Sequence, residues 1–565
     1  MTDSTVKKDS APRTKLEQRW GALKDERASW FGHWADISRY LLPRNGRFFV
    51  QDRNKGWSRT NSIYDSTGTG ALRILAAGMM SGMTSPARPW FKLAVPSNNP
   101  AAKSPAVKKW LNDATIAMRN IFARSNCYRA LHSIYEELAA FGTSACIVAS
   151  DPDMVLRFFP LTAGEYAIAT NMKGEVVTLY REFQKSVGEL VKEFGYDQCC
   201  PSTQSMYDNG SLDQWVSVIH AIEPRADRDR TKIDNTQMPW SSVYFELGGD
   251  PDKVLRESGF KMFRALVPRW SLAGGDIYGG SPSMDCLGDV KGLQQKQLRK
   301  AQAIDYMTKP PLQMPTSMKG QDVETLPGGI AYVDSASPSG GIRSQFEVRL
   351  DLSHLLADIQ DSRQLIRGTY YADLFLMLAN DGGSGRMTAT EVAERHEEKL
   401  LMLGPVLERL QNELLDPLIS ITFQEMIDKR MIGPPPPELA KQPLVVQYVS
   451  MLAQAQQAVG VNSIDRFTGQ LGVMSQVKPQ VLDKFDVDHW ADTYADILGV
   501  DPELVVSDKD VAIVRANRAK AQAAAQQAAQ VPAMAAAAKN ASGVDPQGLH
   551  DVISNFSGYT TPQGT

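Results

Sequence analysis

The N-terminal part of the chain carries apolar residues at helical spacing. Thr14-Lys15-Leu16-Glu17 is a capping box, apolar positions keep a near-helical interval from there to Leu41, and Pro43 ends the pattern. We therefore expect a helix that runs from Leu16 to about Leu42. The same period predicts three more helices, at 65–83, 108–122 and 125–141.

After residue 142 the pattern changes to short apolar runs that are typical of strands. These runs lie at 142–149, 155–160, 165–170, 175–183, 215–222, 242–246 and 260–268. Asn171-Met172-Lys173-Gly174 is a plausible hairpin turn, and Ser186 should cap a short helix that ends near Gly195. Helices first and antiparallel strands after predict an α+β domain of about 280 residues.

The next segment predicts two long helices with a small module between them. Ser281-Pro282 combines a serine cap with proline at the first helical position, which starts a helix over 283–308 that is roughly 35–40 Å long. Lys309-Pro310-Pro311 ends that helix, and a second helix over 352–378 would return antiparallel to it. Two strand candidates lie in the module, at Gly329–Asp334 and Gln345–Leu350.

Glycine, proline and capping signals divide the remaining third of the chain. Three glycines in 379–386 disfavour regular structure, and Thr388-Ala389-Thr390-Glu391 is a capping box that starts a very long helix. Gly404-Pro405 should kink this helix, and Pro434–Pro437 is a rigid break. Later helix candidates are several short ones over 444–498 and an Ala- and Gln-rich tract over 515–539.

Composition narrows the classes of function. The 565 residues include 61 Lys and Arg against 64 Asp and Glu, a formal net charge of −3, which disfavours a protein that coats nucleic acid electrostatically. Five cysteines without a CxxC pair indicate a reducing compartment rather than a disulfide framework. The polar N-terminus and the absence of any run of 18 apolar residues predict no signal peptide and no membrane contact.

Enzyme motifs are absent or incomplete. There is no phosphate-binding loop and no G-x-S-x-G elbow, and Arg73 stands where a dinucleotide fingerprint at Gly68-Thr69-Gly70 needs its third glycine. His396-Glu397 lacks the second histidine of a zinc motif, because Leu400 occupies that position. We therefore expect no catalytic residue, no metal site and no cofactor. An enzyme whose site is assembled from distant residues remains the alternative.

Five short runs occur in a fixed order between residues 16 and 426. They are Ala76–Trp90, Pro160–Tyr166 with Tyr180–Phe183, Tyr278–Leu293, Met387–Val392 and Leu403–Phe423. Each run alone is weakly specific, but the long helices, the inserted module and the Gly-rich loop fall between them in the same order. In this combination the chain resembles the head-to-tail connector, or portal, proteins of short-tailed bacteriophages.

The resemblance implies a mainly helical α+β portal fold that forms a ring, dodecameric in this family, at one capsid vertex. The expected regions are a wing over 1–282, stem helices over 283–308 and 352–378, a clip over 309–351, a tunnel loop over 379–387, a long kinked helix over 388–431, a crown over 432–510 and a C-terminal tail over 511–565.

The same resemblance implies a virion protein, assembled in the host cytoplasm, that conducts double-stranded DNA during packaging and ejection. Besides further copies of the chain, the implied partners are the terminase large subunit, capsid and scaffold proteins, and tail adaptor proteins. A monomeric helical scaffold or adaptor protein of virion assembly is the alternative function.

Two groups of residues are candidates for contact with DNA. Lys296, Arg299 and Lys300 share one face of the first stem helix at i, i+3, i+4 spacing, and Arg363 and Arg367 are similar on the second. A solvated face, or pairing with acidic groups of a neighbouring subunit, is the alternative for these cations. The tunnel loop supplies Asn380, Asp381, Gly382, Gly383, Ser384, Gly385 and Arg386, for which an ordinary helix connector is the alternative.

Overall fold

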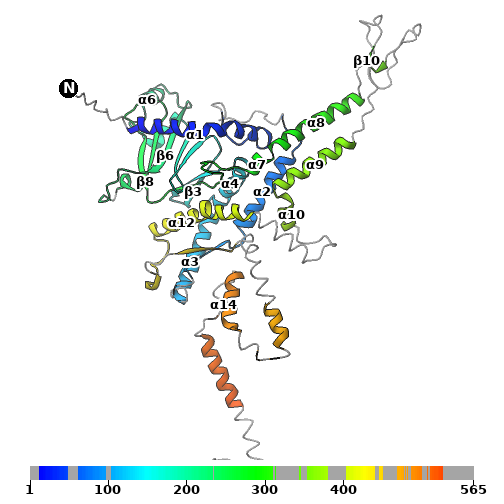
Figure 1. Cartoon of the computed structure of the whole chain (residues 1–565). Helices are drawn as coiled ribbons and strands as arrows, with labels where there is room; N and C mark the ends of the chain where they lie inside the picture. The colour runs from blue at the N-terminus through cyan, green and yellow to red at the C-terminus, as the bar shows by residue number, and fades with distance from the viewer. Residues whose placement is uncertain are drawn as a thin grey trace, which may run out of the picture.

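The computed structural model shows a mixed body of helices and antiparallel sheets from which a hairpin of two helices projects (Figure 1). The structure describes residues 12–48, 62–96, 99, 104–232, 234–308, 312–313, 343–344, 353–379, 403–439, 444–449, 467–475, 478, 480, 485–498, 506 and 510–525. In this part of the chain no helix is both long and apolar enough to cross a membrane.

All four helices expected before residue 142 are present. They are α1 (Pro12–Tyr40), α2 (Thr67–Met83), α3 (Pro105–Arg124) and α4 (Cys127–Phe141). Trp34 and Ile37 of α1 belong to one continuous core with α2 and α4, whereas Trp20 belongs to a second core, where it stacks on Tyr180 at a centroid distance of 6.3 Å. The apolar residues of α1 therefore pack into two separate cores.

Eight strands of the body form two antiparallel sheets. The first, in the order β3-β2-β9, contains β2 (Ala145–Asp151), β3 (Val155–Leu161) and β9 (Ala265–Leu266). The second, in the order β4-β5-β6-β7-β8, contains β4 (Tyr166–Thr170), β5 (Val176–Ser186), β6 (Trp215–Pro224), β7 (Trp240–Glu246) and β8 (Arg256–Phe260). The single strand expected over 260–268 is wrong, because β8 ends at its start and β9 occupies only two of its residues.

Local signals placed the turns of the second sheet correctly. The Asn171–Gly174 turn joins β4 to β5, with Gly174 at a φ of +78° that favours glycine. Ser186 caps α5 (Val187–Phe194) by accepting a bond from the N–H of Glu189 at 3.5 Å. Two further elements were not expected: α6 (Pro201–Asp208) and a short 3-10 turn, η4 (Asn235–Gln237).

The two long helices expected after residue 282 are both interrupted. The first divides into α7 (Pro282–Asp285) and α8 (Leu287–Thr308), and the second divides into α9 (Ser353–Thr369) and α10 (Ala372–Ala379). The interruptions meet in the core, where the hydroxyls of Ser283 and Tyr370 are 2.7 Å apart and both residues are fully buried. Tyr371 has a φ of +53°, so the chain leaves the helical path there to bury its neighbour.

Between α8 and α9, β10 (Leu312–Gln313) and β11 (Arg343–Ser344) pair antiparallel and so keep the two ends of the inserted module together. The strand candidates at 329–334 and 345–350 lie outside the described residues, as does the capping box at 388–391.

The later part of the chain first contributes a helix and a strand to the body and then continues into further helices. Residues 403–410 are helical, η6 (Gln411–Leu415) is a π-helical turn, and α12 (Asp416–Asp428) continues to the proline-rich break, which includes a 3-10 turn, η7 (Pro437–Leu439). β12 (Val445–Tyr448) then pairs antiparallel with β1 (Phe91–Ala94), where short helices had been expected. Helices do follow, at 467–475, in α14 (Val487–Leu498) and at 510–525.

Candidate functional site

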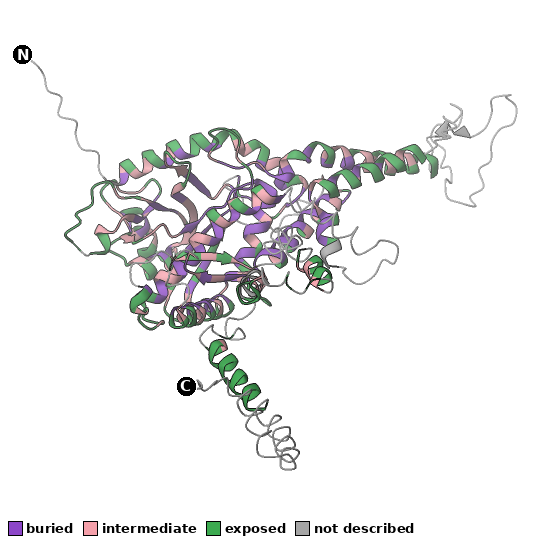
Figure 2. Cartoon of the chain, turned by 60° about the horizontal axis from the view of Figure 1, so that its bottom comes forward, coloured by how far each residue is buried: buried purple, intermediate pink, exposed green. Residues whose placement is uncertain are grey.

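The projecting hairpin of α8 and α9 is packed at its base and exposed along its outer part (Figure 2). The buried residues of α8 all lie in its first eight positions, the last of them Gln294. Ile359, Ser362 and Ile366 are the buried residues of α9. The outer half of the hairpin therefore contains no fully buried residue of α8 beyond Gln294 among the described residues.

Asp65 joins the bases of both hairpin helices to the start of α2. Gln294 of α8 accepts a bond from the backbone N–H of Asp65 at 2.7 Å and donates one to its carbonyl at 2.9 Å. The Asp65 carboxylate accepts bonds from Gln297 of α8 at 2.8 Å and from Nε of Arg363 of α9 at 3.0 Å. It also accepts the N–H and the hydroxyl of Thr67, at 2.9 and 2.6 Å.

These contacts decide the charge of Asp65. Burial raises the pKa of its carboxyl, but the hydrogen bonds from Thr67, Gln297 and Arg363 favour the charged form more strongly and hold the pKa below its usual value. The ion pair between Asp65 and Arg363, at 2.9 Å, is therefore present at neutral pH.

Two of the five cations that were expected to contact DNA form ion pairs within the chain. Lys296 pairs with Asp358 at 2.9 Å and donates to the hydroxyl of Ser362 at 2.8 Å, so it holds α8 to α9. Arg363 is held by Asp65. Sequence reasoning had considered DNA, solvent or a neighbouring subunit as partners of these two residues, whereas the structure pairs both of them within the chain.

The other three cations of this set have no acidic partner among the residues that the structure describes. Arg299 and Arg367 are exposed, and Lys300 is half-buried beside α9. None of the three forms an ion pair with another described residue. They are available to a group outside the described chain, whether a phosphate or a carboxylate.

The expected tunnel-loop residues, Asn380 to Arg386, lie outside the described residues. The helix that leads to them, α10, is described and packs closely on α2. A Cβ atom on Gly78 of α2 would lie 2.2 Å from the ring of Phe375 of α10, so glycine is required for this approach. The position of α10, which leads to Asn380 in the sequence, is thereby set by α2.

A π-helical turn directs Glu413 of the long helix toward Arg269, which is 2% exposed. The Arg269 guanidinium donates to Glu413 at 2.6 Å and to the carbonyl of Gly174 at 2.7 Å, while its backbone N–H donates to the same carboxylate at 2.9 Å. These bonds join the helix to the second sheet. The π-helical turn is an irregular feature of the described helix that the sequence did not predict, while the kink expected at Gly404-Pro405 falls at the first described residues of this helix and stays a prediction.

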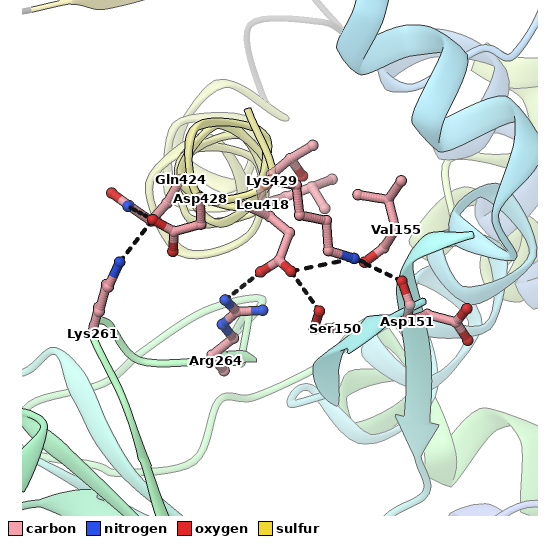
Figure 3. A network of polar contacts seen from close by, with 11 residues as sticks. Ser150, Asp151, Val155, Lys261, Arg264, Leu418, Gln424, Asp428 and Lys429 are labelled. Atoms are coloured by element: carbon pink, nitrogen blue, oxygen red, sulfur yellow. Dashed lines mark hydrogen bonds and ion pairs between the residues drawn. The ribbon is translucent and has the colours of Figure 1, made fainter. Parts of the chain in front are cut away.

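The C-terminal end of α12 carries a second polar network (Figure 3). Glu425 is 4% exposed and accepts bonds from Ser150 and Arg264. Burial raises the pKa of this carboxyl, but those bonds outweigh the effect and the pKa is lowered. Lys429 donates to the carbonyl of Val155 at 3.1 Å, at a residue whose φ of +70° is unusual for a β-branched side chain.

Sequence reasoning missed both networks, because their partners are distant in the chain. Arg269 and Glu413 are 144 residues apart, and Arg264 and Glu425 are 161 apart. Asp65 had a local signal, since an aspartate two residues before Thr67 is typical of a helix start. Among the described residues no group of His, Cys, Asp and Glu side chains is placed to hold a metal ion.

Comparison with known proteins gives consistent matches over nearly the whole chain. A portal protein of Salmonella phage epsilon15 is 44% identical over 550 residues, covering 97% of this chain and 98% of that protein. A probable portal protein of Bordetella phage BPP-1 is 60% identical over 555 residues, covering 98% and 100%. A chain of the virion of a native gene transfer agent particle aligns with 72% of this chain and 92% of its own at 12% identity, with a TM-score of 0.31.

The family comparison agrees with these relatives. The model of the family described as bacteriophage head to tail connecting protein matches residues 13–506, which include the body, the hairpin and α14. The chain therefore belongs to the bacteriophage head to tail connecting proteins.

Proposed function

We propose that this chain assembles into a closed ring, a dodecamer, at one capsid vertex, and that the ring conducts double-stranded DNA during packaging and ejection. In this proposal the ring first docks the terminase large subunit and later the tail proteins, and it contacts capsid and scaffold proteins at the vertex. The observation that carries the proposal is the family match over residues 13–506. The protein acts as a structural conduit with no catalytic step of its own.

The projecting hairpin supports a ring. Isolated helices of this length are marginal in water, and their stability comes from packing of an apolar face. The hairpin nevertheless exposes Ile304 and Met307 on α8 and Leu356 and Leu365 on α9. Further copies of the chain, related by rotation about a common axis, would cover these residues through repeated head-to-tail contacts.

The unpaired cations support contact with a moving polyanion. A uniformly basic bore would bind phosphates too strongly for DNA to slide, because each neutralised phosphate adds salt-dependent affinity. We propose that Arg299 and Lys300, together with the tunnel loop at 380–386, provide a few weak phosphate contacts, while Lys296 and Arg363 stiffen the hairpin.

Replacement of Arg299 and Lys300 by glutamate tests the conduit. We expect rings to form as in the wild type, and the yield of DNA-filled particles in a complementation assay to fall about tenfold, because the bore would then repel phosphates. Lys108 and Lys109, exposed on α3, provide the matched control when both are changed to glutamate.

Full genome packaging by the Arg299 and Lys300 variant would remove these residues from the proposed channel. Deletion of Gly382 to Gly385 tests the tunnel loop in the same assay, with assembly retained and packaging or DNA retention impaired. A purified wild-type chain that stays monomeric with capsid and scaffold proteins present would instead favour the adaptor function.

A further inference from the structure

We infer that neighbouring copies in the ring meet along α9, with an acidic flank of one copy against a basic flank of the next. The acidic flank consists of Asp358, Asp361 and Leu365, and the basic flank consists of Leu356, Arg363 and Arg367. The inference rests on the proposed ring and names the contact that would close it.

Helical geometry places the two flanks on opposite sides of α9. The buried residues Ile359, Ser362 and Ile366 mark the inner side of the helix. At 100° per residue the acidic flank lies about 70–135° to one side of this line, and the basic flank lies about 65–110° to the other.

Two contacts within the chain confirm that assignment. Asp358 of the acidic flank pairs with Lys296 of α8, whereas Arg363 of the basic flank pairs with Asp65 at the start of α2. The flanks therefore face different neighbours even within one copy.

Each flank keeps one charge and one apolar side chain without a partner in the described chain. On the acidic flank Asp361 is exposed and forms no ion pair with another described residue, and Leu365 is 55% exposed. On the basic flank Arg367 is exposed and likewise forms none, and Leu356 is 42% exposed. Opposite charges on opposite sides make the helix complementary to a second copy of itself.

Such complementarity has the symmetry that a ring needs. A ring uses a heterologous contact, in which two different surfaces of each copy meet and the rotation closes. Asp361 and Arg367 are six residues apart, or about 9 Å along the helix. A long arginine side chain and a tilt of the hairpin against the ring axis would bridge that step. The inference thereby assigns Arg367 to a subunit contact rather than to DNA.

Charge reversal with rescue tests the contact in the full-length chain. Asp361→Arg and Arg367→Asp should each raise about tenfold the concentration at which half of the chains are in rings, because each places like charges together. The chain that carries both changes should return to within about twofold of the wild type, since the exchanged charges attract again. Ring fractions are measured by negative-stain electron microscopy and sedimentation velocity.

Gln364 is exposed on the outer side of α9, between the two flanks, so Gln364→Arg and Gln364→Asp are matched controls that should assemble normally. Circular dichroism and thermal unfolding establish that each variant is folded. Normal assembly of either single variant, or a folded double variant that is as impaired as the singles, would overturn the inference and leave the ring itself standing. Absence of rings in the wild type would count against the proposed function instead.

Discussion

Glu137 is a carboxylic acid in the centre of the body, 5% exposed, that joins segments distant in the sequence. It accepts hydrogen bonds from the side-chain amide of Asn45 at 2.8 Å, the hydroxyl of Thr162 at 2.7 Å and the N–H of Ala163 at 3.2 Å. Burial raises the pKa of this carboxyl to about 7, although the three bonds favour its charged form. At the scale of single residues, desolvation here exceeds hydrogen bonding.

The raised pKa of Glu137 predicts a pH-dependent stability. The unfolded carboxyl releases its proton near its ordinary pKa, whereas the folded one keeps its proton to about pH 7, so stability falls as the pH rises between these values. Relative to Glu137→Gln, the free energy of unfolding of the wild type should decrease by about 1–3 kcal/mol from pH of about 5 to about 8. Urea unfolding of both chains across this pH range measures the difference in their free energies of unfolding. A difference that does not change with pH would contradict the raised pKa of Glu137.

α2 packs against the base of the hairpin and against α10, and its small residues allow this close packing. A Cβ atom added to Gly68 would meet the side chain of Val290 of α8, and one added to Gly78 would meet Phe375 of α10. Glycine is poor in a helix interior, but here the close approach of neighbouring elements outweighs its low propensity. At the scale of elements, packing thus decides which residue α2 can carry.

Gly78→Ala should destabilise the protein by about 1–3 kcal/mol, because its methyl group would overlap the Phe375 ring. Gly70→Ala, in the same helix but with nothing within 4 Å of its added Cβ, should be neutral or slightly stabilising. Denaturant unfolding compares the two, and hydrogen exchange in α10 shows whether the loss is local. Equal stability of the two variants would show that Phe375 moves aside without cost.

The chain is joined into one body by segments that return from far along the sequence. β12 closes on β1, the N–H of Val449 donates to the carbonyl of Trp90 at 3.0 Å, and the hydroxyl of Tyr448 bonds Asp416 at the start of α12. The last strand therefore holds α12 and β1 together. At the scale of the whole molecule, the helices after residue 466 follow a segment that is itself fixed to the body.

Successive side chains of β12 point to opposite faces, so substitutions at neighbouring positions should have unequal effects on stability. Val446 is opposite Leu93 and packs against the main core, so Val446→Asp should lower the free energy of unfolding by about 2–3 kcal/mol. Val445 points to the other face and is 42% exposed, so Val445→Asp should cost less than about 1 kcal/mol. Thermal unfolding of both variants measures the two losses of stability. Losses of similar size would contradict the different environments assigned to Val445 and Val446.

Much of the fold could be predicted from the sequence where the signal is local. Caps and periodicity indicated α1 to α4, the Asn171–Gly174 turn and the Ser186 cap, because each depends on residues within one or two turns. The interruptions at Cys286 and at Tyr370 could not be predicted, since the reason for them is a contact between Ser283 and Tyr370 across the core. The π-helical turn at Glu413 and the strand β12 were missed for the same reason.

The candidate site divides in the same way. Composition and spacing identified five cations in the hairpin as candidates, because a basic helix face is visible in the sequence alone. Only the tertiary structure showed that Lys296 and Arg363 are already paired, whereas Arg299, Lys300 and Arg367 form no ion pair with another described residue. Arg363 and its partner Asp65 are 298 residues apart. The sequence by itself determined the elements with local signals, such as α1 to α4, and the charges that the helices carry; the packing of distant segments decided which charges are used within the chain, because an ion pair depends on distance in space.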